Sequence, residues 1–365
     1  MSNNLKKKNR EPLIHITKRA ALPWPKAWAI RGIALILALI LCALITTVFT
    51  GENPIAVYKA ILQGSFGTPR KAWVLFQNLA ILLCASLAVT PAFKMRFWNI
   101  GAEGQVLAGG LATAACMIFL SDKLSPIVLM IVMVAVSIAA GAIWGLIPAF
   151  FKALWNTNET LFTLMMNYVA TCLVSFCLIV WTPNGSSSLG ILPFGHLPAI
   201  GNEYLLIILI TVALTIGMYI YLYYSKHGYE ISVVGESFKT ACYIGIDVKK
   251  VIIRTMIVSG VLCGLAGFLI VGGLDHSVTT ETVGGRGFTA IMVSWLAKFN
   301  PAIMALTSLF IVFLSQGAAQ VSQNFDISPA FPDMITGIIL FFIIGCEFFI
   351  DYKVNFRSRK KGGEQ

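Results

Sequence analysis

The chain has 365 residues, of which 57% are hydrophobic and 12% are charged. Because soluble domains are about a quarter charged and the mean hydropathy here is +0.81, the composition excludes an ordinary soluble protein and indicates that lipid surrounds most of the chain. The formal net charge of +11 does not indicate nucleic-acid binding, since the basic residues lie in tails and loops between apolar runs and form no compact basic domain.

The apolar runs predict an all-α polytopic membrane protein with about ten transmembrane helices. A span takes about 20 apolar residues, and the runs of that length cover 28–50, 72–92, 99–120, 127–150, 160–181, 204–224, 251–274, 302–320 and 333–350. A tenth run, 288–298, would cover only about half of the hydrocarbon core. It follows a glycine-rich turn and precedes Asn300-Pro301, so a half-helix or re-entrant segment is as compatible with the sequence as a full span.

Lysine and arginine indicate the orientation of these spans. They gather in the N-terminal tail 1–27, the long connection 225–250 and the C-terminal tail 351–365, whereas the connections 182–203 and 321–332 contain neither. Because short cytoplasmic segments carry the excess of basic residues, both tails are predicted to be cytoplasmic. The region between them, 28–350, forms a single transmembrane domain, and the run that begins at residue 28 is too long for a signal peptide.

Catalytic and metal-binding patterns are absent from the sequence. There is no G-x-x-x-x-G-K-[ST] loop, no H-E-x-x-H and no G-x-S-x-G, and the four histidines are not at ligand spacing. The eight cysteines lie mostly singly inside apolar runs, as buried small hydrophobic residues do. The sequence therefore predicts no catalytic residue, no metal site and no cofactor in this chain.

The longest cytoplasmic connection is predicted to contain a short helix that lies along the membrane. Ser237 can cap a helix over 239–243, Gly245 can end it, and Asp247 can cap the next membrane helix. Such a helix could receive force from a cytosolic motor. An ordinary amphipathic connector fits the same spacing equally well.

Polar residues at the start of one apolar run are candidates for a substrate pathway. Asn99, Glu103 and Gln105 open this run, and polar groups at membrane depth usually face a bundle interior or a water-filled pathway. An ion pair of Glu103 with Lys94 or Arg96 at the interface is an equally compatible interpretation.

Further pathway candidates lie in two other runs. Asn167 lies deep within its run, while Phe76 and Gln77 open theirs toward the outside, where an aromatic ring beside an amide could contact a base or a sugar. Interfacial aromatic residues are more often membrane anchors, which is the plainer interpretation of Phe76. The motifs at 141–145 and 260–264, both G-x-x-x-G, predict close helix packing.

Several longer segments carry a resemblance to a known family. They are WNIGAEGQVLAGG (98–110), TNETLFTLMMNY (157–168), GESFKTACYIGIDVKK (235–250), SGVLCGLAGFLIVGG (259–273), GRGFTAIMVSWLAKFNP (285–301) and CEFF (346–349). Through them the chain resembles bacterial ABC importer permeases of the branched-chain amino acid, ribose and nucleoside type, most closely the nucleoside permeases. It departs from the family pattern at Trp98, where phenylalanine is usual, and at Lys298-Phe299, which replaces a Gly-Arg-Leu type of turn.

The resemblance implies a fold like that of the vitamin B12 importer permease and a location in the bacterial inner membrane. It implies a translocation pathway for nucleosides between two permease subunits, the second a shorter paralogue. An external lipoprotein would deliver substrate, and a separate cytosolic ATPase would use ATP and magnesium. A ribose-type sugar permease, and a stand-alone secondary transporter, remain the alternatives.

The resemblance also carries roles onto particular residues. The ATPase-coupling residues it implies are Gly235, Glu236, Ser237, Lys239, Tyr243, Gly245 and Asp247. The substrate-pathway candidates, chosen from their residue type and position in the membrane runs, are Asn99, Glu103, Gln105, Asn167, Phe76 and Gln77.

Overall fold

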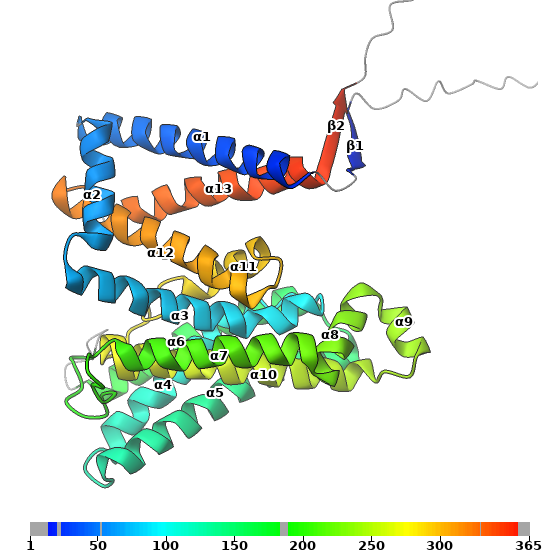
Figure 1. The fold of residues 1–365 in the computed structure, drawn as a ribbon. Helices are drawn as coiled ribbons and strands as arrows, with labels where there is room; N and C mark the ends of the chain where they lie inside the picture. Colours follow the sequence, from blue (N-terminus) through cyan, green and yellow to red (C-terminus); the bar gives the residue numbers. More distant parts are fainter. Residues whose placement is uncertain (1–13, 20–22, 52, 183–188, 329, 357–365) are drawn as a thin grey trace, which may run out of the picture. The chain divides into compact units, whose positions relative to one another are not determined.

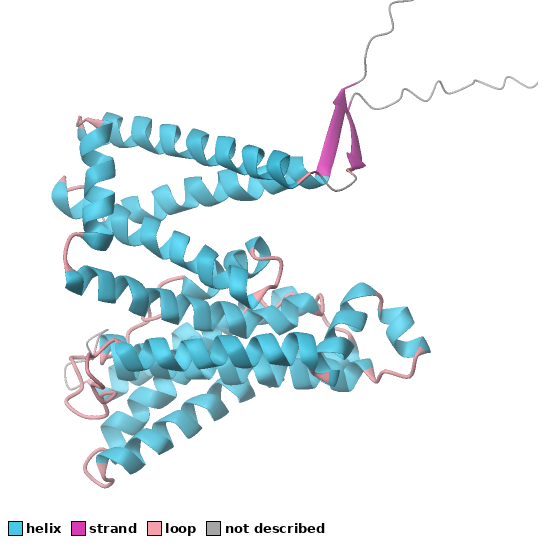
Figure 2. Ribbon diagram, in the orientation of Figure 1, coloured by secondary structure: helices cyan, strands magenta, loops and turns pink. Residues whose placement is uncertain are grey.

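The computed structural model describes residues 14–19, 23–51, 53–182, 189–328 and 330–356. Two compact units divide the chain: unit 1 is formed by Met1–Gly64 and Leu314–Gln365, and unit 2 by Ser65–Phe313. Figure 1 labels the helices and strands, and Figure 2 shows that the described part of the chain is almost entirely helical. This confirms the prediction of an all-α membrane protein.

Unit 2 contains most of the helices. In chain order they are α3 (Pro69–Lys94), α4 (Ala102–Leu120), α5 (Pro126–Trp155), α6 (Glu159–Trp181), α7 (Leu205–Tyr224), α8 (Lys226–Glu236), α9 (Phe238–Tyr243), α10 (Val248–Ile270), the π-helical turn η1 (Val271–Asp275) and α11 (Arg286–Leu296). At the centre, α10 packs against α3, α4 and α5. The predicted motif glycines allow this approach, because a β-carbon on Gly141 would lie 2.6 Å from the Cα of Gly264. The close packing predicted from the two glycine motifs is therefore confirmed.

Unit 1 contains α1 (Trp24–Thr50) and α13 (Phe331–Asp351), which pack against each other. The first part of α2 (Pro54–Phe66) and the last part of α12 (Pro301–Asn324) also belong to it. Two strands, β1 (Ile14–Lys18) and β2 (Tyr352–Phe356), pair antiparallel with Ile14 opposite Phe356. These are the strands drawn in magenta in Figure 2.

Nine helices among the described residues are long and apolar enough to cross a membrane. They correspond to the nine long apolar runs. The short tenth run forms α11, whose 11 residues rise about 16 Å, or about half of a hydrocarbon core. Of the two interpretations left open by the sequence, the structure therefore favours the half-helix.

Two helices and two strands were not predicted. Helix α2 lies in a segment expected to be an outer loop, and α8 fills the first half of the connection 225–250. Both are too short to show as membrane spans. The strands β1 and β2 lie in the two tails, and only the alternation of apolar residues in IHITK and YKVNF signals them.

Candidate functional site

Helices α8 and α9 lie at the end of unit 2 where α7 ends and α10 begins (Figure 1). Ser237 caps α9 by accepting a hydrogen bond from the backbone N–H of Thr240 at 3.2 Å. Asp247 caps α10 by accepting from the N–H of Lys250 at 3.3 Å. Gly245 follows α9 in the left-handed conformation, with φ of 84°. The predicted short helix and its caps are therefore confirmed, with α9 beginning one residue earlier at Phe238.

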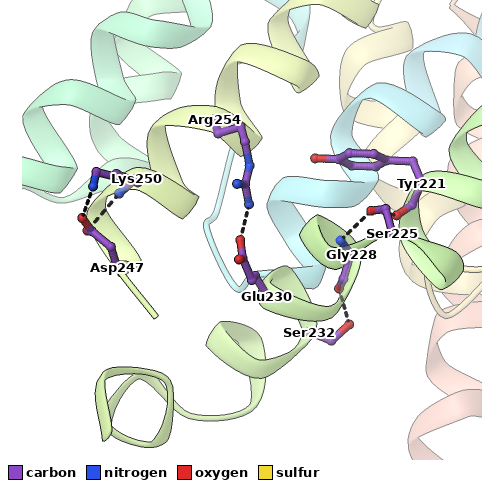
Figure 3. Close-up of polar contacts among 8 residues, drawn as sticks. All are labelled: Tyr221, Ser225, Gly228, Glu230, Ser232, Asp247, Lys250 and Arg254. Carbon is purple, nitrogen blue, oxygen red and sulfur yellow. Dashed lines mark hydrogen bonds and ion pairs between the residues drawn. The ribbon is translucent and has the colours of Figure 1, made fainter. Parts of the chain in front are cut away.

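Helix α8 is braced against the membrane helices (Figure 3). An ion pair joins Glu230 on α8 to Arg254 on α10, with 2.6 Å between Oε2 and Nη2. Ser225 accepts from the N–H of Gly228 at 3.0 Å and donates to the carbonyl of Tyr221 at 2.6 Å, which joins α8 to the end of α7. These contacts therefore join α8 to both α7 and α10.

Gly235 is buried and lies next to the last residue of α8. It packs so closely on the end of α3 that a β-carbon here would collide with the carbonyl oxygen of Lys94. The glycine in GESFKTACYIGIDVKK thus has a packing reason, because any side chain would push α8 away from α3.

Helix α9 and the turn after it present apolar side chains to solvent. The exposed fractions are 59% for Phe238, 96% for Tyr243 and 53% for Ile244, while Ala241 is buried beneath them. The predicted coupling residues Glu236 and Lys239 are also exposed. A cluster of exposed apolar groups beside charged ones is typical of a protein–protein interaction surface.

The Glu230–Arg254 pair is expected to hold α8 in place. In a double-mutant cycle of Glu230→Ala and Arg254→Ala, we expect a coupling energy of about 0.5–3 kcal/mol, because both side chains are two-thirds buried or more. Lys250→Ala is the matched control, since its ion pair with Asp247 is exposed and such pairs contribute about 0–1 kcal/mol. The measurements are thermal unfolding in detergent and hydrogen exchange of α8. A coupling energy of zero would show that the Glu230–Arg254 pair does not hold α8 and that its other contacts position it.

The cap of α10 is expected to depend on pH. Hydrogen bonds from the Lys250 N–H and then its side chain hold the pKa of Asp247 below its ordinary value of 3.8. A lowered carboxyl pKa stabilises the folded state above the ordinary value, and this contribution is lost as pH falls through the lowered pKa. The protection factor of the amides in the first turn of α10, which compares their exchange with that of a free peptide at the same pH, should therefore fall below about pH 4. Asp247→Asn, which keeps a capping oxygen, should abolish this dependence.

A second group of predicted residues forms a buried polar network at the start of α4. Asn99 donates from Nδ2 to Oγ of Ser259 at 3.3 Å, and Gln105 donates from Nε2 to Oδ1 of Asn99 at 3.2 Å. The exposed fractions of Asn99 and Gln105 are 0% and 1%. Buried amides paired in this way fix the irregular segment between α3 and α4 against α10.

Asn167 fixes the same segment from α6. Its Oδ1 accepts from the N–H of Gly104 at 2.8 Å, and its Nδ2 donates to the carbonyl of Ile100 at 2.9 Å. Gly104 has room for no side chain here, because a β-carbon would lie 2.9 Å from Oδ1 of Asn167. The structure thus brings Asn99, Gln105 and Asn167 together around one turn.

Glu103 joins this turn to the half-helix. Its Oε1 accepts from the N–H of Gly285 at 2.8 Å, and its Oε2 accepts from the N–H of Gly287 at 2.7 Å. These donors are at the N-terminus of α11, where a negative charge is favoured by the helix dipole. The interface pairing considered for Glu103 is therefore not what the structure shows, because both carboxylate oxygens bind backbone groups of α11.

The remaining pathway candidates lie elsewhere. The Phe76 side chain is 42% exposed, whereas Gln77 is buried and donates from Nε2 to the carbonyl of Gly273 at 3.1 Å, beyond the end of α10. Because Asn99, Gln105 and Gln77 are almost fully buried, none of them offers surface to a substrate in this conformation. A pathway role for the six candidates stays a prediction.

Two features of the site were not anticipated from the sequence. Glu230 and Arg254 are 24 positions apart on different helices, and no local pattern relates them. The backbone partners of Glu103 lie 182 and 184 positions away.

Within the ranges that the structure describes, no group of three or more His, Cys, Asp and Glu side chains could hold a metal ion.

The nine long apolar helices among the described residues define a polytopic membrane protein. A family model supports the same class. The chain belongs to the family of permease components of branched-chain amino acid transport systems, whose model matches residues 74–344.

Curated relatives resemble the chain over most of its length. The glucose ABC transporter permease protein TsgB13 of Haloferax volcanii is 26% identical, and the match covers 93% of each chain. The guanosine ABC transporter permease protein NupP of Bacillus subtilis is 26% identical over 90% of this chain and 96% of its own. The nucleoside ABC transporter permease protein NupB of Lactococcus lactis is 26% identical over 85% of this chain and 89% of its own.

Proposed function

We propose that this protein is the permease subunit of an ABC importer and forms the translocation pathway for nucleosides. The observation that carries the substrate class is the near full-length similarity to a guanosine and a nucleoside permease. Sugar transport is the second candidate, because a glucose permease of similar identity matches over 93% of the chain.

The exposed surface of α9 supports a role in coupling to a cytosolic ATPase. This partner would bind ATP and magnesium, and Phe238 and Tyr243 would contact it, since they are exposed on a short helix that α8 braces. The predicted coupling set Gly235, Glu236, Ser237, Lys239, Tyr243, Gly245 and Asp247 spans this same segment. A second permease subunit and an external substrate-binding lipoprotein complete the proposed importer, with both chain termini in the cytoplasm.

Uptake in the source cells tests the substrate class. Cells with and without this gene are given labelled uridine, guanosine or ribose, with each unlabelled compound as competitor. We expect selective loss of nucleoside uptake. Loss of ribose uptake alone would move the protein to the sugar class, and no loss would contradict the importer role.

Coupling is tested by Phe238→Ala and Tyr243→Ala in the complete transporter. We expect nucleoside uptake to fall by about tenfold or more, because exposed aromatic anchors dominate protein interfaces. Phe194→Ala is the matched control. Phe194 is also an exposed ring, but it lies before the start of α7, whereas α8 and α9 lie after the end of α7. Unchanged uptake in both α9 variants, at equal abundance in the membrane, would contradict the coupling role of α9.

A further inference from the structure

A pocket of about 450 Å³ opens beside the proposed coupling segment, residues 235–247. Its walls come from the end of α3 and the turn that follows, the end of α11, and α8. The lining residues are Phe93, Lys94, Arg96, Trp98, Ser232, Gly235, Glu236, Trp295 and Phe299. We call this the aromatic pocket. Its volume is within the range of about 300–1,000 Å³ typical of small-molecule sites.

Four aromatic rings form one contiguous cluster in the aromatic pocket. The ring centroids of Trp98 and Trp295 are 5.4 Å apart, Phe93 lies edge-on to Trp98 at 5.9 Å, and Phe299 lies 6.1 Å from Trp295. Phe93 is buried, but the exposed fractions of Trp98 and Trp295 are 46% and 49%. The two indoles are therefore fixed by their neighbours and still offer surface to an occupant.

Polar groups lie among these rings. Lys94 and Arg96 supply positive charge, Glu236 supplies a carboxylate and Ser232 a hydroxyl. A surface that faces lipid tails would not place four polar side chains around one cavity. The lining instead matches a ligand that combines a flat aromatic body with hydrogen-bonding groups.

The backbone around the aromatic pocket adopts unusual conformations. Arg96, Lys298 and Phe299 have φ of 60°, 50° and 62°, in the left-handed region that residues with a β-carbon rarely adopt. Such conformations persist where the surrounding structure enforces them, and they cluster at ligand sites.

We propose that the aromatic pocket binds the planar base of a nucleoside at the α8–α9 end of the protein, by stacking on Trp98 and Trp295. Every nucleobase has a flat π face that stacks on aromatic side chains, and the polar side chains can meet its edge or the sugar hydroxyls. This inference rests on the proposed nucleoside substrate. Because Gly235 and Glu236 belong both to the pocket and to the coupling segment, an occupant would contact the element proposed to meet the ATPase.

Tryptophan fluorescence of the complete transporter in lipid nanodiscs tests the site directly. Guanosine is expected to quench the emission and ribose is not. Trp98→Phe and Trp295→Phe should each remove part of the quench, whereas Trp181→Phe, at the far end of α6, should not. Trp98→Ala should raise the apparent Kd for guanosine by about fivefold or more, the lower end of what base stacking on one aromatic ring contributes.

Three results would overturn the aromatic-pocket proposal alone. The first is a guanosine quench that Trp98→Phe and Trp295→Phe both leave unchanged. The second is ATPase activity of the complex that falls in these variants without nucleoside, because the rings would then contact the partner subunit. The third is nucleoside uptake that depends on the gene while Trp98→Ala leaves its KM unchanged, which would contradict the aromatic pocket and leave the proposed function intact. If instead deletion of the gene leaves nucleoside uptake unchanged, the proposed function itself fails and the pocket proposal fails with it.

Discussion

Gly264→Val is expected to prevent unit 2 from folding in the membrane. A β-carbon on Gly264 would collide with the carbonyl oxygen of Ser137 on α5. The helices are so close here that a β-carbon added to Gly109 or to Gly141 would lie only 2.6 Å from the Cα of Gly264. The obstacle is backbone on both sides, which cannot move aside as a side chain can. The loss of stability should therefore exceed the about 1–3 kcal/mol typical of an overpacked core.

Gly217→Val is the matched control for this effect. Gly217 lies within α7, and a β-carbon there meets no atom within 4 Å, so the substitution tests valine in a membrane helix without the collision. The measurements are the yield of monodisperse protein after extraction in detergent and its Tm. Equal yield and Tm for Gly264→Val and Gly217→Val would show that α5 and α10 are not as close as described.

Glu103→Ala is expected to free the N-terminus of α11 and to abolish most uptake. Two backbone N–H groups, those of Gly285 and Gly287, would lose their acceptor, and a buried donor left unsatisfied costs about 1–3 kcal/mol. Uptake of labelled guanosine should fall by about tenfold or more as the half-helix loses its fixed position. Glu103→Gln, which keeps one acceptor oxygen, should have an intermediate effect.

Glu281→Ala controls for the loss of a carboxylate in the same region. Glu281 precedes the glycine-rich turn, and its side chain is exposed. Hydrogen exchange at Gly285 and Gly287 measures the release of α11 separately from transport. The Glu103→Ala and Glu281→Ala variants could show the same exchange rates at these two amides and the same rate of guanosine uptake. In that case, α11 would not depend on Glu103 for its position.

The positions of the membrane helices followed from the sequence because lipid imposes a local rule. No water satisfies the backbone inside a bilayer, so each span must be a helix of sufficient length and apolar composition. The caps of α9 and α10 followed for a similar reason, because Ser237 and Asp247 bind N–H groups only three residues away. The motif glycines also predicted the close approach of α5 and α10, because small residues at that spacing in membrane helices allow two backbones to come together.

The polar side chains could be located in the sequence but their partners could not. The sequence placed Glu103 and Asn99 at the start of a membrane run, and for Glu103 two interpretations remained open. The structure chose between them for Glu103, because its partners come from the turn before α11, far along the chain. For Asn99 it supplied Ser259 on α10 as a partner, 160 positions away.

The sequence by itself determined the polytopic membrane class, the membrane helices and the short helix α9 with its caps, since each depends on hydrophobicity or on contacts within a few residues. Only the tertiary structure decided that the tenth run is a half-helix held by Glu103, that Arg254 fixes α8 to α10, and that Trp98 and Trp295 meet in one pocket. It also paired β1 with β2, at opposite ends of the chain. Each of these outcomes depends on residues that are distant in sequence, and their proximity is set by how the helices pack rather than by any local preference.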